Sequence, residues 1–198
     1  MKRIRVAVYV LGLAVAAAPA AAATKHSVGA NLIVNGGFEQ PAVGAGSYKL
    51  FSTGQAFTGW QVVGTRGNVA PISGRFQQNG ISFVSQSGKQ WLDLTGLSNT
   101  PTGVAQTVAT HPGARYRLSF AVGNVKGGVF GVRSTVIVLV NGRKVLSATN
   151  AGGGTRQGWK SFAVTVRASS VRTTIAFMNG DPSGDTSNGL DAVSFIAR

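Results

Sequence analysis

The chain contains no cysteine, five acidic residues and two histidines among its 198 residues. Without cysteine it can form no disulfide, no cysteine-ligated zinc site and no lipid anchor on a cysteine. Neither histidine, His26 or His111, stands beside a serine nucleophile, and the sequence holds no G-x-S-x-G or H-E-x-x-H motif. A glycosidase needs two carboxylates facing each other across a sugar, and the spacing of the five acids favours no such pair. We therefore predict that the protein is not an enzyme.

The first 23 residues have the composition of an export signal. A basic segment, an apolar run and a small-residue A-x-A cleavage site follow one another at residues 2–5, 6–18 and 21–23. The apolar run is shorter than the roughly 20 residues that span a bilayer, and Pro19 interrupts it. We predict a signal peptide over residues 1–23, no membrane span, one domain over residues 24–198, and a secreted or periplasmic location.

Positive charge greatly exceeds negative charge, with a net charge of +14. Three of the nineteen basic residues belong to the predicted signal, so the mature chain stays strongly basic. Such a charge concentrates anionic partners within about 8 Å of the surface at physiological salt. Because export separates the protein from genomic nucleic acid, we expect a polysaccharide or an anionic cell-surface glycan as partner and no nucleic acid. The alternative is that the charge only keeps the surface well solvated.

Apolar and polar residues alternate with a period of two along several segments, and no helical periodicity competes with this pattern. In Arg115–Val122, one face carries Tyr116, Leu118, Phe120 and Val122. Residues 159–167 and 171–177 repeat the alternation. Strands with one apolar face predict an all-β fold, a two-sheet antiparallel sandwich.

Turn residues separate these strands. Asn141 and Gly142 both tolerate positive φ, so we predict a type I′ turn that joins residues 135–140 to residues 143–149 in a hairpin. Residues 42–54, which contain three glycines, form a long loop near the start of the domain. Long loops in compact domains are often functional.

Several motifs carry a family resemblance. In chain order they are NLIVNGGFEQP at residues 31–41, FTGW ending at Trp60, QWLDLTG at 90–96, GVAQTVATHPGARYRLSFAVGN at 103–124, VNG at 140–142, Trp159 and GLDAVSF at 189–195. The set resembles the galactose-binding-like jelly roll of plant cell-wall proteins, a domain of unknown function, and of bacterial choice-of-anchor C proteins. The resemblance implies an extracellular β-jelly roll related to carbohydrate-binding modules, with Trp60 and Trp159 in the core. Plant relatives usually have two domains and cysteines, so this cysteine-free chain is expected to be a single free module.

An exposed aromatic ring would carry sugar binding, since a flat ring covers the apolar face of a pyranose. Leu92 and Leu94 are expected to face inward, which turns Trp91 and Asp93 to the other side of their strand. The alternative is that Trp91 packs beneath a loop or the other sheet. Tyr48, in the long loop, would form the rim of the site or hold the loop on the sandwich.

Arg115 and Arg117 project from the polar face of their strand, where guanidinium groups suit the carboxylates of uronic acids. Charges on a strand also protect it from unwanted pairing, which is the alternative explanation for both arginines.

The first motif and the last motif are expected to meet. Residues 32–34 would begin the first strand, residues 35–37 would turn the chain, and Glu39 would reach toward Asp191. The two carboxylates would then supply hard oxygens to a structural Ca²⁺, as related jelly rolls often do. In the alternative, both accept hydrogen bonds from loop N–H groups or pair with arginine.

These observations favour a secreted, non-catalytic protein similar to carbohydrate-binding modules. A structural surface or matrix protein without glycan affinity is the alternative, and a hydrolase with an unrecognised site is a third possibility. Jelly rolls with one fold bind many ligands, so the fold does not choose among these functions.

Overall fold

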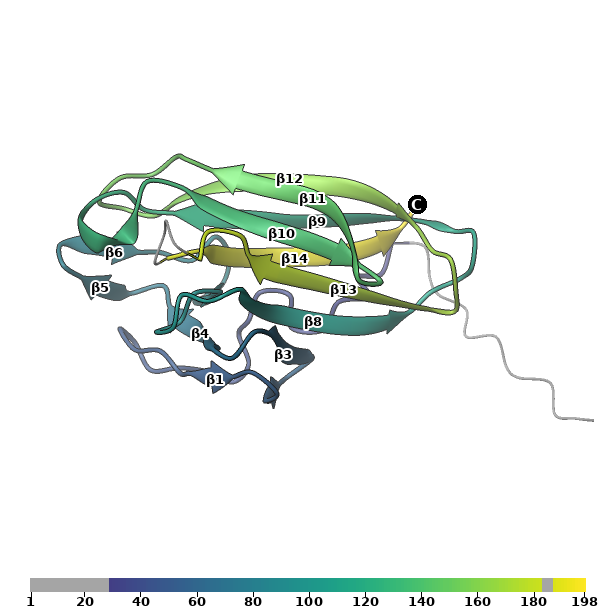
Figure 1. Cartoon of the computed structure of the whole chain (residues 1–198), viewed down its shortest axis with the longest axis horizontal. Coiled ribbons are helices and arrows are strands. Elements are labelled where there is room, and N and C mark those ends of the chain that lie inside the picture. The colour runs from purple at the N-terminus through teal and green to yellow at the C-terminus, as the bar shows by residue number, and fades with distance from the viewer. Residues whose placement is uncertain (1–28, 183–186) are drawn as a thin grey trace, which may run out of the picture.

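The computed structural model describes residues 29–182 and 187–198, which form two six-stranded sheets packed face to face (Figure 1). The first sheet contains, in spatial order, β1 (Phe51–Ser52), β4 (Asn68–Ser73), β7 (Gln90–Asp93), β14 (Gly189–Ala197), β9 (Arg115–Asn124) and β12 (Gly158–Arg167). The second contains β11 (Arg143–Asn150), β10 (Ser134–Val140), β13 (Arg172–Asn179), β8 (Thr102–Ala109), β3 (Trp60–Gly64) and β2 (Ala56–Phe57). The strand pairs in both sheets are antiparallel. The predicted all-β sandwich is confirmed.

Two further elements lie outside these sheets. β5 (Phe76–Gln78) and β6 (Ile81–Phe83) pair only with each other, and η1 (Gly128–Phe130) is a single 3-10 turn. Among the described residues, no helix is long and apolar enough to cross a membrane. The predicted export signal, His26 and Asp185 lie outside the described residues.

The main hydrophobic core lies between the two sheets. In β9, the face predicted to be apolar is buried in this core, and Tyr116 and Leu118 are completely inaccessible to solvent. Trp60 of β3 also lies in this core, as the resemblance implies. Trp159 of β12 does not, because it packs against a second cluster on the other side of the first sheet. The expectation for Trp159 is therefore wrong.

The predicted hairpin at Asn141-Gly142 joins β10 to β11. Both turn residues have positive φ, 49° for Asn141 and 77° for Gly142, as a type I′ turn requires. A second hairpin of this kind, between β5 and β6, turns at Asn79 and Gly80 with φ values of 51° and 76°. This second turn was not recognised in the sequence.

The N-terminal segment, residues 31–39, runs beside β14 and ties the two ends of the chain together. The Asn31 side-chain oxygen accepts hydrogen bonds from the backbone N–H groups of Ile33 and Phe195. The backbone N–H of Val193 donates to Gly36 O at 2.9 Å. The expected first strand at residues 32–34 is absent: an isolated bridge pairs Asn31 with Ile196, and the first strand in chain order is β1. Single hydrogen bonds, in place of the predicted strand, therefore hold the N-terminal segment against β14.

We expect Gly36→Ala to destabilise the fold, because a Cβ at this position would lie 2.1 Å from Val193 O. Overpacking of this kind typically costs about 1–3 kcal/mol. For a domain of this size, that corresponds to a melting temperature about 2–12 °C lower. Gly154→Ala is the matched control, since a Cβ at that position would meet no atom within 4 Å. Equal melting temperatures for the two variants in a thermal scan would show that residues 31–39 are not held tightly against β14.

Candidate functional site

The candidate site lies on the outer face of the first sheet, opposite the main core. Strand β7 places Leu92 in the main core and turns Trp91 and Asp93 outward, as the alternation predicts. Residues that pair across strands share a face, so Ile72 of β4 lies beside Trp91, and Ala70 lies beside Asp93. These four side chains form the base of the site.

The β5–β6 hairpin covers this base and makes a second hydrophobic cluster. The rings of Phe83 and Trp91 are stacked, with centroids 5.9 Å apart and an interplanar angle of 13°. Phe130 of η1 meets Phe83 edge-on at 5.2 Å, and Phe76 lies 5.6 Å from Phe83 on its other side. Trp91 is fully buried beneath the hairpin. This corrects the expectation of an exposed ring in favour of the alternative, a tryptophan packed beneath a loop.

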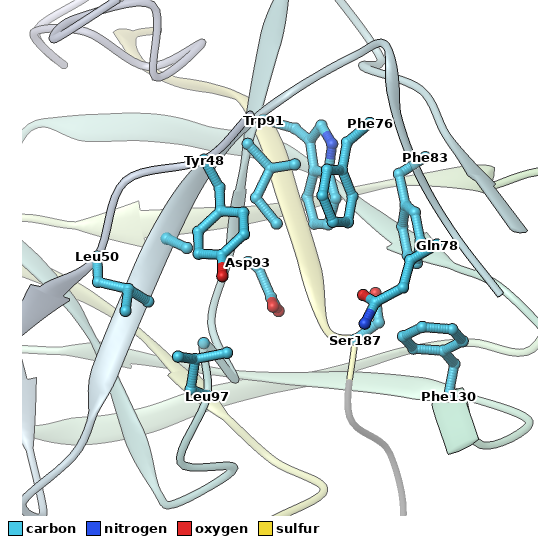
Figure 2. A pocket seen from close by; sticks show the side chains of 13 residues that line it. Tyr48, Leu50, Phe76, Gln78, Phe83, Trp91, Asp93, Leu97, Phe130 and Ser187 are labelled. Carbon is cyan, nitrogen blue, oxygen red and sulfur yellow. The ribbon is translucent and has the colours of Figure 1, made fainter. Parts of the chain in front are cut away.

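The rings do not fill the space, and they leave an open cavity of about 120 Å³, here called the aromatic cavity. Its lining consists of Tyr48, Leu50, Ala70, Ile72, Phe76, Gln78, Phe83, Trp91, Asp93, Gly96, Leu97, Phe130 and Ser187. Figure 2 shows the Asp93 carboxylate and the Tyr48 hydroxyl directed toward one space, with the Gln78 amide on its other side. No lysine, arginine or histidine is among the described lining residues.

Tyr48 forms the rim of the aromatic cavity. It pairs with Ile72 in an isolated bridge, and its ring meets Phe76 edge-on with centroids 5.7 Å apart. The residue remains 41% exposed, so one side of the ring faces solvent. Tyr48 therefore both holds the long loop on the sheet and lines the cavity, which combines the two roles left open by the sequence.

Asp93 is the charged side chain of the described lining, and it is 6% exposed. Its Oδ1 accepts hydrogen bonds from the backbone N–H groups of Thr95 at 3.0 Å and Asn188 at 3.1 Å. The Thr95 hydroxyl also donates to the carboxylate. Burial raises the pKa of Asp93 to about 6, although these hydrogen bonds act to lower it.

The Trp91 ring lines the same cavity, but its indole nitrogen does not face the space in which the Asp93 carboxylate lies (Figure 2). This Nε1 is buried and, within the described residues, has no hydrogen-bond partner. A buried N–H without an acceptor typically costs about 1–3 kcal/mol.

Arg115 and Arg117 do not belong to the aromatic cavity. They lie at the start of β9, where Arg117 pairs with Ile196 near the end of β14. Trp91 and Asp93 lie level with the opposite end of β14, at Gly189–Asp191. The structure thus brings Tyr48, Trp91 and Asp93 together and leaves both arginines elsewhere on the sheet.

The sequence reasoning missed the aromatic residues that wall the cavity, Phe76, Phe83 and Phe130. The signal for the first two was the Asn79-Gly80 turn, which is flanked by both phenylalanines at equal distances along the hairpin. Phe130 has no comparable signal, because it follows a glycine-rich loop and reaches the site only through the fold.

Glu39 and Asp191 meet, as predicted, at the loop over residues 86–90. Glu39 Oε1 accepts hydrogen bonds from the backbone N–H groups of Lys89 and Gln90 at 2.8 and 3.0 Å. Asp191 Oδ2 accepts from those of Gln86 and Ser87 at 2.9 and 3.0 Å. Burial raises the pKa of Asp191 to about 6, and the nearby charge of Glu39 raises it further, while hydrogen bonds act in the opposite direction.

The donors around these carboxylates fit the hydrogen-bond alternative better than a Ca²⁺ site. Calcium requires six to eight oxygen ligands, whereas the groups that point at Glu39 and Asp191 include four backbone N–H groups. Among the described residues, no three Asp, Glu or His side chains gather as a metal site. Structural calcium stays a prediction from the sequence, and the hydrogen bonds to both carboxylates favour its alternative, in which loop N–H groups hold Glu39 and Asp191.

The two packed antiparallel sheets define the class of fold, a β-jelly roll. The chain belongs to the family of proteins of unknown function named DUF642, whose profile matches residues 31–194. Family membership confirms the resemblance seen in the sequence. A comparison with curated protein sequences finds no match.

Several solved structures share the fold. A cyclase from Fischerella sp. TAU is 19% identical with a TM-score of 0.58, over 83% of this chain and 94% of the cyclase. The CBM22-1 xylan-binding domain of Paenibacillus barcinonensis Xyn10C is 16% identical with a TM-score of 0.47, over 79% of this chain and 97% of that domain. A family 35 carbohydrate-binding module from Clostridium thermocellum is 13% identical with a TM-score of 0.47, over 77% and 99%. At these identities the likeness concerns the fold alone.

We expect chelation to leave the melting temperature of the protein unchanged, because backbone N–H groups already satisfy the Glu39 and Asp191 carboxylates. Asp191→Ala should lower the melting temperature, since it removes a buried acceptor from three backbone N–H groups. The measurement is a thermal scan of both proteins with EDTA and with added calcium. A loss of stability in EDTA that calcium restores, and that Asp191→Ala abolishes, would establish the calcium site.

We expect the free energy of unfolding to increase as the pH falls from about 7 to about 4. Asp93 and Asp191 take up protons near pH 6 in the folded protein and near their ordinary value of 3.8 in the unfolded chain. Between these two pH values the folded state therefore binds more protons than the unfolded state. Its stability consequently falls as the pH rises through about 6. Urea denaturation at pH 4.5 and 7.5 measures the difference. Asp93→Asn should show a smaller difference than the natural protein. If the natural protein were equally stable at both pH values, or more stable at pH 7.5, the raised pKa values would be contradicted.

Proposed function

We propose that the protein is a non-catalytic carbohydrate-binding protein whose aromatic cavity takes one sugar ring. The observation that carries this proposal is the pairing of aromatic walls with a buried carboxylate that points into the same space (Figure 2). Binding sites for small polar molecules typically combine mainly apolar walls with a few convergent polar groups. The predicted export signal would place the cavity among the glycans outside the cytoplasm.

The size of the aromatic cavity limits the ligand to one ring. A buried cavity of about 150 Å³ holds benzene, and the aromatic cavity measures about 120 Å³. One monosaccharide can therefore enter in part, with its remaining hydroxyls in solvent. We infer recognition of a terminal or branch sugar, since an unbranched internal stretch of chain would have to pass through the cavity.

Each polar group in the aromatic cavity has a defined task in this proposal. Asp93 accepts a hydrogen bond from a sugar hydroxyl, and the Gln78 amide lies on the other side of the space, where it can donate one. Tyr48 covers the apolar face of the ring from the open side. Burial of about 100 Å² of apolar surface contributes roughly 2.5 kcal/mol, less than the roughly 4 kcal/mol of millimolar binding, so the polar contacts must supply the difference.

The charge of the aromatic cavity selects against acidic sugars. A uronic acid would place its carboxylate near Asp93, and no described lining residue is basic. Like charges in a partly desolvated site repel strongly. The ligand of the cavity is therefore a neutral sugar.

The cavity does not support glycoside hydrolysis. Two-carboxylate hydrolysis needs a second carboxyl group within about 5–9.5 Å of the first, and Asp93 is the sole carboxylate among the described lining residues. We therefore favour binding over catalysis.

We expect the protein to be retained on at least one immobilised neutral polysaccharide and to be released by one matching free monosaccharide. Tyr48→Ala should weaken binding by tenfold or more, because it removes the solvent-side wall. Trp91→Phe should weaken it several-fold, since the smaller ring removes part of the aromatic base of the cavity. Val171→Ala, at a site 66% exposed and outside the cavity, is the control.

Calorimetric titration with the monosaccharide gives the affinities, and thermal scans show whether each variant is folded. Retention on no glycan would leave the structural, glycan-independent alternative, and release of reducing ends from the same panel would identify a hydrolase. Binding that Tyr48→Ala and Trp91→Phe do not change would place the sugar site outside the aromatic cavity.

A further inference from the structure

A second hollow lies on the outer face of the first sheet, over β9, β12 and β14. It measures about 290 Å³. Small side chains cover the strands here: Ser119 and Ala121 of β9, Ser161 and Ala163 of β12, and Ala192 and Ser194 of β14. The small residues leave an open, flat floor.

Three arginines stand at one end of this floor. Arg115 and Arg167 are directly opposite each other on β9 and β12, and Arg117 lies two pairs further along, opposite Thr165. All three are exposed. They share the outer face, because the residues between and beside them, Tyr116 and Val166, point into the main core. Side chains in a directly opposed pair lie about 4.5–5.5 Å apart at Cβ. Together with the hollow, these arginines are called the arginine face.

No carboxylate among the described residues neutralises the arginine face. Glu39 and Asp191 are held by the loop over residues 86–90, Asp93 lies in the aromatic cavity, and Asp181 pairs with Arg133 at 3.4 Å. Like charges directly opposite each other destabilise a sheet. Bound anionic groups would remove this repulsion, and guanidinium groups bind carboxylates and sulfates through paired hydrogen bonds.

The arginine face is separate from the aromatic cavity. The residues that line the two hollows do not overlap. Figure 1 shows the β5–β6 hairpin, which covers the cavity, at one end of the long axis, and the C-terminus after β14 at the other. Arg115 lies at this second end, because the backbone N–H of Arg198 donates to its carbonyl oxygen.

We propose that the arginine face binds a linear acidic polysaccharide, with the chain on the floor of small residues and its carboxylate or sulfate groups on Arg115, Arg117 and Arg167. Consecutive side chains on one face of a strand lie about 6.6–6.8 Å apart, so Arg115 and Arg117 hold two charges along β9, and Arg167 adds a third beside Arg115. Charges spread over several positions match a polymer with regularly repeated anions. Nucleic acid fits less well, because single strands bind through aromatic stacking platforms and the outward side chains of the floor are Ser, Ala and Thr.

The test compares two variants that remove equal charge from different places. The first variant removes the three charges of the arginine face: Arg115→Gln/Arg117→Gln/Arg167→Gln. The second variant removes three exposed charges from the second sheet: Arg143→Gln/Lys144→Gln/Arg172→Gln. Both variants should remain folded in a thermal scan, because the substituted side chains are exposed. Binding to polygalacturonate and to heparin is measured across a salt series.

We expect the first variant to lose at least tenfold in affinity and to show a shallower salt dependence, because fewer bound counterions are exchanged. The second should lose no more than about threefold through the general charge. Equal losses would overturn the proposal in favour of non-specific attraction. Binding of single-stranded DNA as tight as that of polygalacturonate, with the same loss in the first variant, would assign the face to nucleic acid instead. Tyr48→Ala should leave polyanion binding unchanged, so failure of the cavity and failure of the arginine face are distinguishable.

Discussion

The structure depends on one asymmetry of the first sheet, which buries apolar side chains on both faces at β4 and β7 and, beyond Trp159, on mainly one face along β9 and β12. The period of two in β7 sends Leu92 into the main core and Trp91 to the opposite side. A tryptophan on an outer face needs a cover, and the β5–β6 hairpin supplies it through Phe83. The aromatic rings of this cover do not fill the space above the sheet, and the space that remains is the aromatic cavity. Where the outer face carries only small residues, the sheet stays open and forms the floor of the arginine face.

Acidic residues are scarce, and the fold uses the described ones internally. Glu39 and Asp191 hold the loop over residues 86–90, and Asp93 holds the turn after β7 while it lines the cavity. The basic side chains are left on the surface with few carboxylate partners. The positive charge of the described residues thus lies at the surface, while their negative charge lies in buried or half-buried positions. The two proposed sites follow this division: the cavity carries a carboxylate and excludes anions, and the arginine face attracts them.

Local patterns predicted the fold well because they act through the backbone. The alternation in β9 and the paired positive-φ residues of the β10–β11 turn depend only on neighbouring residues, and both are confirmed. The prediction for the N-terminal segment failed for a different reason: Leu32 and its neighbours have the composition of a strand, but the segment bonds to β14 at separate points. Asn31 bridges Ile196, and Gly36 O accepts a hydrogen bond from the Val193 N–H, so no continuous ladder forms. The prediction that Trp159 lies in the main core was also wrong. A strand residue can be assigned to the core face of a sheet only once the position of the core is known.

Period-two alternation and turn chemistry, which are properties of short segments, determined the class of fold and the outward direction of Trp91 and Asp93, and the resemblance to a known family implied that the first and last motifs meet. Only the tertiary structure decided that Trp91 is covered, that Tyr48 joins it, and that Arg115 and Arg117 lie apart from both. Those facts depend on which segments pack over the outer face of the sheet. Such packing joins residues that are far apart in the chain, as Phe130 is from Trp91, and no local pattern records it.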